Sequence, residues 1–181
     1  MKKRINGNKI AFAGIGAAVS LGSIIASFYI SQISLSLNIL AAFGLMIPLS
    51  KQYYRESILS YVAVCLLGGI FANIHIIPFV MIGGAYTIFS VAIYKKRLKL
   101  PLWLSYVIKI FYSCLVFFIL YYVTQIFFLD LSKIGLYLSG SALYLTLNLI
   151  FVVLFIIYDT LLIYAYKLIV QLVERITRGR S

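Results

Sequence analysis

Residues 1–30 read MKKRINGNKIAFAGIGAAVSLGSIIASFYI, a short basic segment followed by an apolar run from Ile10 to Ile30. This run has about the 20 residues that a transmembrane α-helix needs, and it is longer than the apolar core of a cleavable secretory signal. We therefore expect the run to be a first membrane span that is retained in the protein.

The same arrangement, an apolar run that ends at basic residues, recurs along the chain. Nearly all of the 16 Lys and Arg residues fall in four clusters. The clusters are Lys2, Lys3, Arg4 and Lys9; Lys51 and Arg55; Lys95, Lys96, Arg97 and Lys99; and Lys167, Arg175, Arg178 and Arg180. Short loops rich in Lys and Arg remain in the cytoplasm. The sequence thus predicts that all four clusters and both termini are cytoplasmic, so the number of spans is even.

Six spans fit this pattern, which predicts an all-α fold: a polytopic membrane protein with six transmembrane helices. The predicted spans are residues 10–30, 33–50, 57–73, 76–94, 102–128 and 141–167. We expect them to form a single transmembrane helical domain over residues 1–181. The last two stretches exceed a minimum crossing, which implies tilt or a helical extension beyond the bilayer.

Composition supports a membrane protein and argues against two other classes. The chain is 64% hydrophobic and 11% charged, whereas roughly a quarter of the residues in a soluble domain are charged. A net charge of +12 would suggest nucleic acid as the partner of a soluble chain. Here the placement of basic residues in cytoplasmic loops accounts for nearly all of that charge. We therefore expect no nucleic-acid binding.

The first span carries a row of small residues. Gly14, Ala18, Gly22 and Ala26 follow one another at four-residue spacing, with Ala13 and Ala17 beside them. Such a row lets a second helix approach closely and gain packing energy that lipid does not supply. The row could pack against another helix of the same chain or could dock a partner subunit, and the sequence leaves these two readings about equal.

Two opposite charges lie inside the last two predicted spans, Lys109 and Asp159. Each is costly in hydrocarbon unless it is paired or hydrated. Counted from the basic ends of their helices, both lie at about the same depth, roughly 12 to 15 Å into the membrane. We expect them to form an ion pair. A structural role is favoured over a proton relay or a ligand contact, because one isolated pair provides no path for a proton.

Several amides and tyrosines are predicted in the outer half of the membrane. This candidate ligand set consists of Asn38, Asn73, His75, Tyr122, Gln125, Tyr144 and Asn148. A cavity lined by amides and aromatic rings would suit a small, flat, mostly uncharged molecule. The amides could equally form hydrogen bonds between helices. His75 is expected to be a loop histidine rather than a metal ligand, because no second ligand lies near it in the sequence.

The sequence contains no nucleophile–base set, no paired carboxylates and no phosphate-binding or zinc-protease motif. We therefore expect neither an enzyme nor an ATPase, and no cofactor or metal. Energy for any transport would have to come from a partner or from a gradient.

In size, topology and the alanine-rich start of its first span (Ala11, Ala13, Ala17, Ala18), the chain resembles the S component of energy-coupling factor transporters. Ala13 and Ala17 match the AxxxA pattern with which that family docks on a transmembrane coupling subunit. The resemblance implies uptake of a vitamin-like micronutrient, bound from outside, with ATPase subunits as further partners. The loop after the first span is shorter than the loop common in that family.

Part of the chain is also similar to a group of uncharacterised Firmicutes membrane proteins. The residues that carry this likeness lie in Tyr53–Tyr94, chiefly Ile77, Pro78, Phe79, Gly83, Gly84 and Tyr86, together with Lys109, Tyr158 and Asp159. It implies a bacterial plasma membrane and no particular activity. The alternative to a transport function comes from a different functional class. The helical bundle is also similar to that of the small rod-shape-determining membrane protein, which would make the chain a membrane scaffold of the cell-wall or cell-shape machinery.

Overall fold

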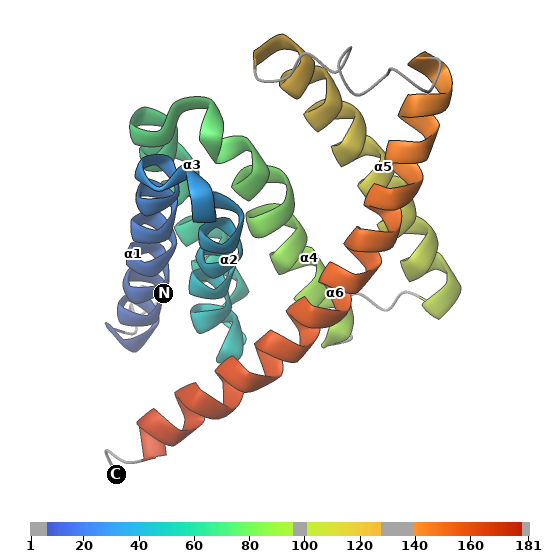
Figure 1. The fold of residues 1–181 in the computed structure, drawn as a ribbon. Coiled ribbons are helices and arrows are strands. Elements are labelled where there is room, and N and C mark those ends of the chain that lie inside the picture. The colour runs from blue at the N-terminus through green and yellow to red at the C-terminus, as the bar shows by residue number, and fades with distance from the viewer. Residues whose placement is uncertain (1–6, 96–100, 128–139, 179–181) are drawn as a thin grey trace, which may run out of the picture. The chain divides into compact units, whose positions relative to one another are not determined.

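The computed structural model describes residues 7–95, 101–127 and 140–178, and within these ranges the regular structure is entirely helical. Figure 1 shows the elements in chain order. They are α1 (Gly7–Tyr29), η1 (Ser31–Ile33), α2 (Ser34–Ser50), α3 (Tyr54–Ala72), η2 (Asn73–Ile76), η3 (Phe79–Tyr86), α4 (Thr87–Tyr94), α5 (Leu102–Phe127) and α6 (Gly140–Arg178). The predicted all-α class is confirmed.

Over the described residues the predicted spans are nearly all helical, and α6 continues past the last predicted span to Arg178. Four stretches are long and apolar enough to cross a membrane: Gly7–Tyr29, Tyr54–Ala72, Trp103–Tyr122 and Tyr144–Thr177. Two more apolar stretches, Ser36–Ser50 and Phe79–Tyr94, are shorter. The helices thus have the length and composition of a membrane-spanning protein. Six complete crossings with cytoplasmic termini remain a prediction.

The chain divides into two compact units. Unit 1 comprises Met1–Arg97 and Leu162–Ser181, and unit 2 comprises Leu98–Leu161. The division falls inside α6, so this helix contributes its first half to unit 2 and its second half to unit 1. Because one continuous helix belongs to both units, the predicted single domain stays a prediction.

Unit 1 has an apolar core formed mainly where α1, α2 and α3 pack together. Its buried members are Ile24, Ala41, Leu45, Val64, Ala72, Ile76 and Phe79. In a membrane protein such a core gains little from the hydrophobic effect, since lipid is equally apolar, and depends on close packing. The buried serines of α1 and α3 supplement the packing with hydrogen bonds, since Ser57 Oγ donates to the Leu45 carbonyl (3.1 Å).

The closest helix contact in unit 1 is the crossing of α1 and α2 at Gly16 and Gly44. A Cβ on either glycine would lie 2.6 Å from the carbonyl oxygen of the other. Ser20 Oγ, one turn further along α1, donates to the Ala41 carbonyl at 2.7 Å. The backbones can approach this closely only because both contact residues lack a side chain.

The turn from α2 to α3 ends α2 in a Schellman arrangement. Gln52 has a φ of 60°. Its N–H donates to the Leu49 carbonyl (2.9 Å), and the Tyr53 N–H donates to the Pro48 carbonyl (3.1 Å). Two carbonyls that the last helical turn leaves open are thereby satisfied. This turn carries the second basic cluster, as the sequence predicts.

The segment after the η2 turn begins as a π-helix, η3, before it continues as α4. The Tyr61 ring of α3 lies where a side chain on Gly84 would project, so only glycine fits there. Tyr61 also donates its hydroxyl to the Val80 carbonyl at 3.0 Å. One aromatic side chain therefore anchors the π-helical turn on α3. The sequence analysis did not predict this wider turn.

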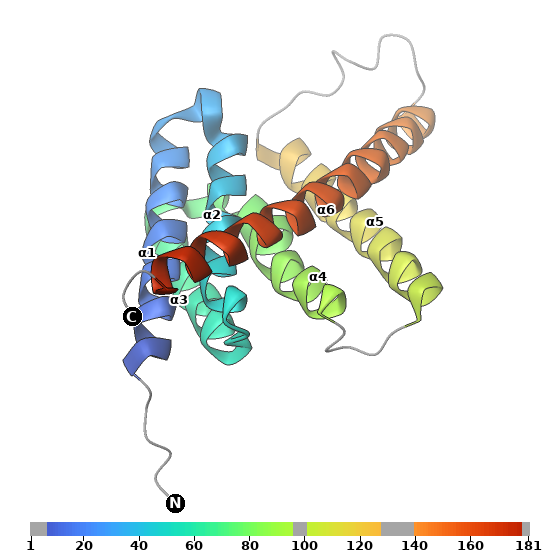
Figure 2. The ribbon, with the colours of Figure 1, turned by 90° about the horizontal axis from the view of Figure 1, so that it is seen from below.

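The second half of α6 crosses the basic end of unit 1. Tyr166 donates its hydroxyl to the Leu49 carbonyl (3.2 Å), and Lys51 Nζ donates to Thr177 Oγ1 (3.2 Å). Both contacts reach the C-terminal end of α2, although Tyr166 and Thr177 lie three helical turns apart. Figure 2 shows this half of α6 passing across the ends of α1, α2 and α3.

One lysine from each basic cluster lies at this end of unit 1: Lys9, Lys51, Lys95 and Lys167. Lys9 lies over the Tyr53 ring, and Lys95 lies over the Tyr166 ring. The other contacts of this group join the ends of α2, α4 and α6. Their common location agrees with the prediction that the clusters share one side of the membrane. Residues 2–4, 96–99 and 180 lie outside the described residues.

Candidate functional site

Three of the four residues in the predicted docking row on α1 face away from the rest of unit 1. Gly14, Ala18 and Gly22 are exposed. A Cβ on Gly14 or Gly22 would meet no atom within 4 Å among the described residues. Ala26, the last member of the row, is half-buried. The part of α1 from Gly14 to Gly22 therefore presents a shallow, small-residue surface that the described chain does not fill.

Ala13 and Ala17, the pair that matches the AxxxA pattern, lie beside this surface and are half-buried. The Ala13 carbonyl accepts a hydrogen bond from Ser60 Oγ of α3 (2.9 Å). Ala17 packs against the unit 1 core. The six predicted docking residues thus divide between an outward face and a face directed into unit 1.

Sequence reasoning missed the small residues that do bring two helices of this chain together, Gly16 and Gly44. Gly16 and Ser20 also stand at four-residue spacing, so the signal was present. The row that begins at Gly14 is longer, so the sequence analysis assigned helix packing to that row and not to Gly16. α1 therefore has two small-residue faces, of which one is occupied by α2.

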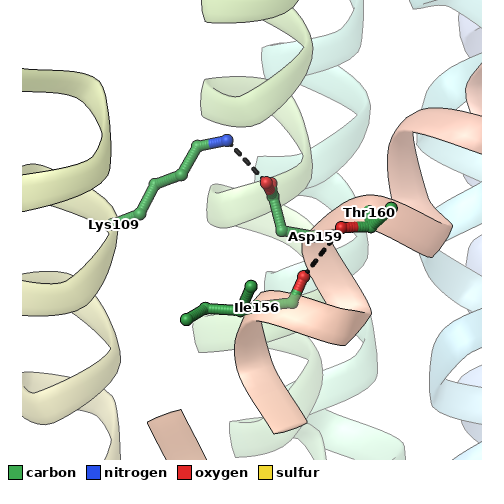
Figure 3. A network of polar contacts seen from close by, with 4 residues as sticks. All are labelled: Lys109, Ile156, Asp159 and Thr160. Atoms are coloured by element: carbon green, nitrogen blue, oxygen red, sulfur yellow. Dashed lines mark hydrogen bonds and ion pairs between the residues drawn. The ribbon is translucent and has the colours of Figure 1, made fainter. Parts of the chain in front are cut away.

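Unit 2 is an antiparallel pair formed by α5 and the first half of α6, and it contains the predicted ion pair. Lys109 Nζ lies 2.6 Å from Asp159 Oδ2, and the side chains are 13% and 12% exposed. Figure 3 shows Lys109 extending from α5 toward the carboxylate on α6. The predicted contact is confirmed. At this distance the ammonium donates a charge-assisted hydrogen bond, which offsets part of the cost of removing both ions from water.

Residues near the ion pair show how α5 and α6 hold it. Thr160 Oγ1 donates to the Ile156 carbonyl within α6 (3.1 Å), which satisfies that hydroxyl locally (Figure 3). Ser113, one turn after Lys109, is buried, and its Oγ has no hydrogen-bond partner among the described residues. The rings of Tyr112 and Phe155 lie 6.2 Å apart, between the same two helices. The contacts between α5 and α6 near the ion pair thus include an aromatic ring pair as well as this charged hydrogen bond.

An aromatic cluster continues the α5–α6 contact beyond the ion pair. Phe117 contacts Tyr144 and Phe151 of α6, with ring centroids 5.3 and 5.5 Å apart. Tyr121 meets Tyr144 edge to face at 5.1 Å. Rings in such arrangements gain somewhat more than their buried area alone provides. The sequence analysis named Tyr144 as a ligand residue and did not foresee that it belongs to this interhelical packing.

The remaining predicted ligand residues of unit 2 lie on the same pair of helices. Tyr122 is exposed, with its ring 4.6 Å from Phe118. Asn148 Oδ1 accepts a hydrogen bond from Cys114 Sγ at 3.6 Å. This contact is a hydrogen bond from α5 to an amide on α6. It fits the alternative in which the amides form hydrogen bonds between helices. The side chain of Gln125 lies outside the described residues.

The other members of the candidate ligand set belong to unit 1. Asn38 is buried on α2, where its Nδ2 donates to the Ser34 carbonyl (3.0 Å). Its Oδ1 is without a partner in the part of the chain that the structure describes. Asn73 is exposed at the end of α3, where φ is 50° and ψ is −129°, a conformation that favours glycine over residues with a Cβ. The His75 side chain lies outside the described residues.

Over the described ranges, no group of three or more His, Cys, Asp or Glu side chains is placed to hold a metal ion. Comparisons of the chain with protein-family models, with curated proteins and with solved structures find no match. The assignment of a function therefore depends on the surfaces and contacts described above.

Proposed function

We propose that the chain is the substrate-binding membrane subunit of a transporter, which takes up a small vitamin-like molecule together with an ATP-driven partner module. In this proposal it lies in a bacterial plasma membrane with both termini in the cytoplasm. The observation that carries the proposal is the outward small-residue surface of α1, formed by Gly14, Ala18 and Gly22.

A membrane helix gains from such a surface only when another helix packs on it. Lipid chains fill a shallow groove poorly, whereas a second helix can bring its backbone close and gain dispersion energy and weak hydrogen bonds. Helix α2 uses the Gly16 face of α1, so the Gly14 face is left for a different partner. A transmembrane coupling subunit, which would carry the ATPases, is the partner that the resemblance implies.

The ligand part of the proposal rests on the amides and rings named above. Within unit 2, Tyr122, Tyr144 and Asn148 provide rings and an amide on α5 and α6. These groups suit a flat, mostly uncharged molecule with a few hydrogen-bonding atoms. The chain itself supplies no group for hydrolysing ATP, so the partner module would supply the energy.

The test is affinity purification of the chain from native membranes in mild detergent, with mass spectrometry of the copurifying proteins. The variant Gly14→Leu/Ala18→Leu fills the outward surface. Gly69→Leu/Ala63→Leu is the matched control, because both residues are exposed on α3 and a Cβ on Gly69 meets nothing within 4 Å. We expect a coupling subunit with ATPases to copurify with the wild type and the control, and to be lost from the first variant.

Other outcomes would overturn the proposal. Recovery of cell-wall synthesis proteins instead would favour the membrane scaffold, which could use the same surface of α1. Recovery of the same ATPases with all three proteins would show that the α1 surface is not where they dock.

A further inference from the structure

The length of α6 is the first of three observations that concern its second half. The helix has 39 residues, so it is about 58 Å long, whereas the hydrocarbon core of a bilayer is about 30 Å thick. A large part of α6 must therefore lie outside the hydrocarbon or along its boundary. Since the second half crosses the end of α2 rather than running beside it, a location along the boundary fits the contacts.

The second observation is the distribution of side chains on this half of α6. Leu168, Leu172 and Ile176 are exposed and recur at four-residue spacing, so they form one stripe. Tyr166 and Val173 are buried on a different side, toward the rest of unit 1. The charged and polar residues Lys167, Gln171, Glu174 and Arg175 are exposed. An exposed apolar stripe beside a polar face is the pattern of a helix lying in the membrane interface.

The third observation is a pair of lysines held on tyrosine rings where this helix meets the end of α4. Lys95 Nζ lies 5.6 Å from the centre of the Tyr166 ring, and Lys167 Nζ lies 5.6 Å from the centre of the Tyr94 ring. The two rings are themselves 6.2 Å apart. Among the described residues, the ion pairs are Lys9 with Glu56 and Lys109 with Asp159, so neither lysine of this cluster has a carboxylate partner.

We propose that Lys95 and Lys167, held over the Tyr94–Tyr166 ring pair, bind the phosphate of an anionic phospholipid such as phosphatidylglycerol. Each ammonium group lies over a tyrosine ring of the other helix and has no carboxylate partner among the described residues, so a lipid phosphate would supply a negative charge that this cluster lacks. The exposed Leu168 and Leu172 side chains follow directly on α6, where they would contact the acyl chains of the same lipid. That adjacent apolar stripe is why a lipid fits better than a free phosphate ion. The rings fix the lysines at the interface, where tyrosine prefers to lie.

The test uses the purified full-length chain in an uncharged detergent and follows the midpoint of thermal unfolding as lipid is added. Phosphatidylglycerol should raise the midpoint, because a ligand that binds only the folded state stabilises it. Phosphatidylcholine with the same acyl chains, and inorganic phosphate, should leave it nearly unchanged. For Lys95→Gln/Lys167→Gln we expect the lipid concentration at half-effect to rise about 30-fold, since each lysine contributes a factor of about five.

The matched control is Lys9→Gln/Arg55→Gln, which removes the same charge at the same end of unit 1 but away from the ring pair. It should keep the response of the wild type to phosphatidylglycerol, and Lys95→Arg/Lys167→Arg should keep most of it. Equal loss in the Gln variants of both pairs would show a diffuse charge effect and overturn the proposed site. Equal stabilisation by phosphatidylcholine, or by inorganic phosphate, would overturn the assignment of the ligand.

If Lys95→Gln/Lys167→Gln does not fold, the salt dependence of the lipid effect on the wild type still tests the proposal. Raising the NaCl concentration from about 0.1 M to about 1 M shortens the screening length about threefold. The effect of phosphatidylglycerol should then largely disappear. A lipid effect that is unchanged by salt would contradict binding through the two ammonium groups.

Discussion

The Lys109 ammonium and the Asp159 carboxylate meet at 2.6 Å between α5 and α6, the two helices that also bring the Tyr112 and Phe155 rings together. Removing the carboxylate would leave the Lys109 ammonium without the counter-ion that it has in the structure. Removing both and filling the space with apolar side chains would abolish that cost. The contact therefore predicts opposite results for single and double substitutions.

We expect Asp159→Asn to lower the free energy of unfolding in detergent by about 3 kcal/mol. Lys109→Met/Asp159→Leu should recover most of this loss. Thr160→Val is the matched control on the same helix, where an exposed hydroxyl bonds only within α6. A double variant less stable than either single one would show that the ion pair is not the reason for the loss.

Two glycines on α1, two residues apart, should respond oppositely to alanine. Gly16→Ala places a Cβ 2.6 Å from the Gly44 carbonyl oxygen, so we expect a loss of about 1–3 kcal/mol from overpacking. Gly14→Ala meets no atom within 4 Å, and it should be neutral or stabilising by up to about 1 kcal/mol, because alanine favours the helix. Denaturation of both variants in mixed micelles measures the difference. Similar losses in both would mean that α1 and α2 do not cross at Gly16.

The backbone conformation of Gln52 suggests a substitution that should stabilise the protein. Its φ of 60° lies in the left-handed region, which costs a residue with a Cβ about 1 kcal/mol. Gln52→Gly removes this strain but frees the unfolded chain, so we expect a net gain of about 0.5 kcal/mol. Lys51→Gly, at the neighbouring position with a φ of −94°, should give no gain. A midpoint of thermal unfolding that falls for Gln52→Gly would contradict the described turn.

The ligand part of the proposed function predicts stabilisation by a small molecule. A screen of vitamin-like compounds by thermal unfolding should give at least one that raises the midpoint. At a concentration about 100 times its Kd, it should add about 2.7 kcal/mol. Asn148→Ala should reduce the effect, whereas Thr146→Ala, an exposed position on the same helix, should not. No response to any compound, or equal responses from both variants, would argue against this ligand set.

Hydropathy and charge predicted much of the helical architecture, because a bilayer requires long apolar segments and basic residues tend to lie at their ends. The first span was expected at 10–30 and is helical over Gly7–Tyr29. The Lys109–Asp159 contact could be predicted because helical rise converts sequence distance from a basic end into depth. The sixth helix was predicted to end near residue 167, and it continues to Arg178. Hydropathy marks where a span can stop, and does not show that the helix continues beyond that point.

Other features could not be read from one sequence because they depend on which helix faces meet. The Gly16–Gly44 crossing requires two glycines from different helices to coincide, and many small residues in this chain could have done so. The wide helical turn at Gly84 depends on the Tyr61 ring of a neighbouring helix. The candidate ligand set was defined by its predicted depth in the outer half of the membrane. Depth along a helix does not show that Asn38 and Asn148 belong to different units.

The central claim is that the Gly14 face of α1 packs on a partner, and site-specific photo-crosslinking in native membranes tests it most directly. A photoreactive amino acid is placed at Ala18 or, as a control, at Leu66, which is exposed on α3. We predict that Ala18 yields an adduct with a transmembrane coupling subunit and that Leu66 yields only lipid adducts. If Ala18 captures only lipid, or if both positions capture the same protein equally, the proposed docking surface is contradicted.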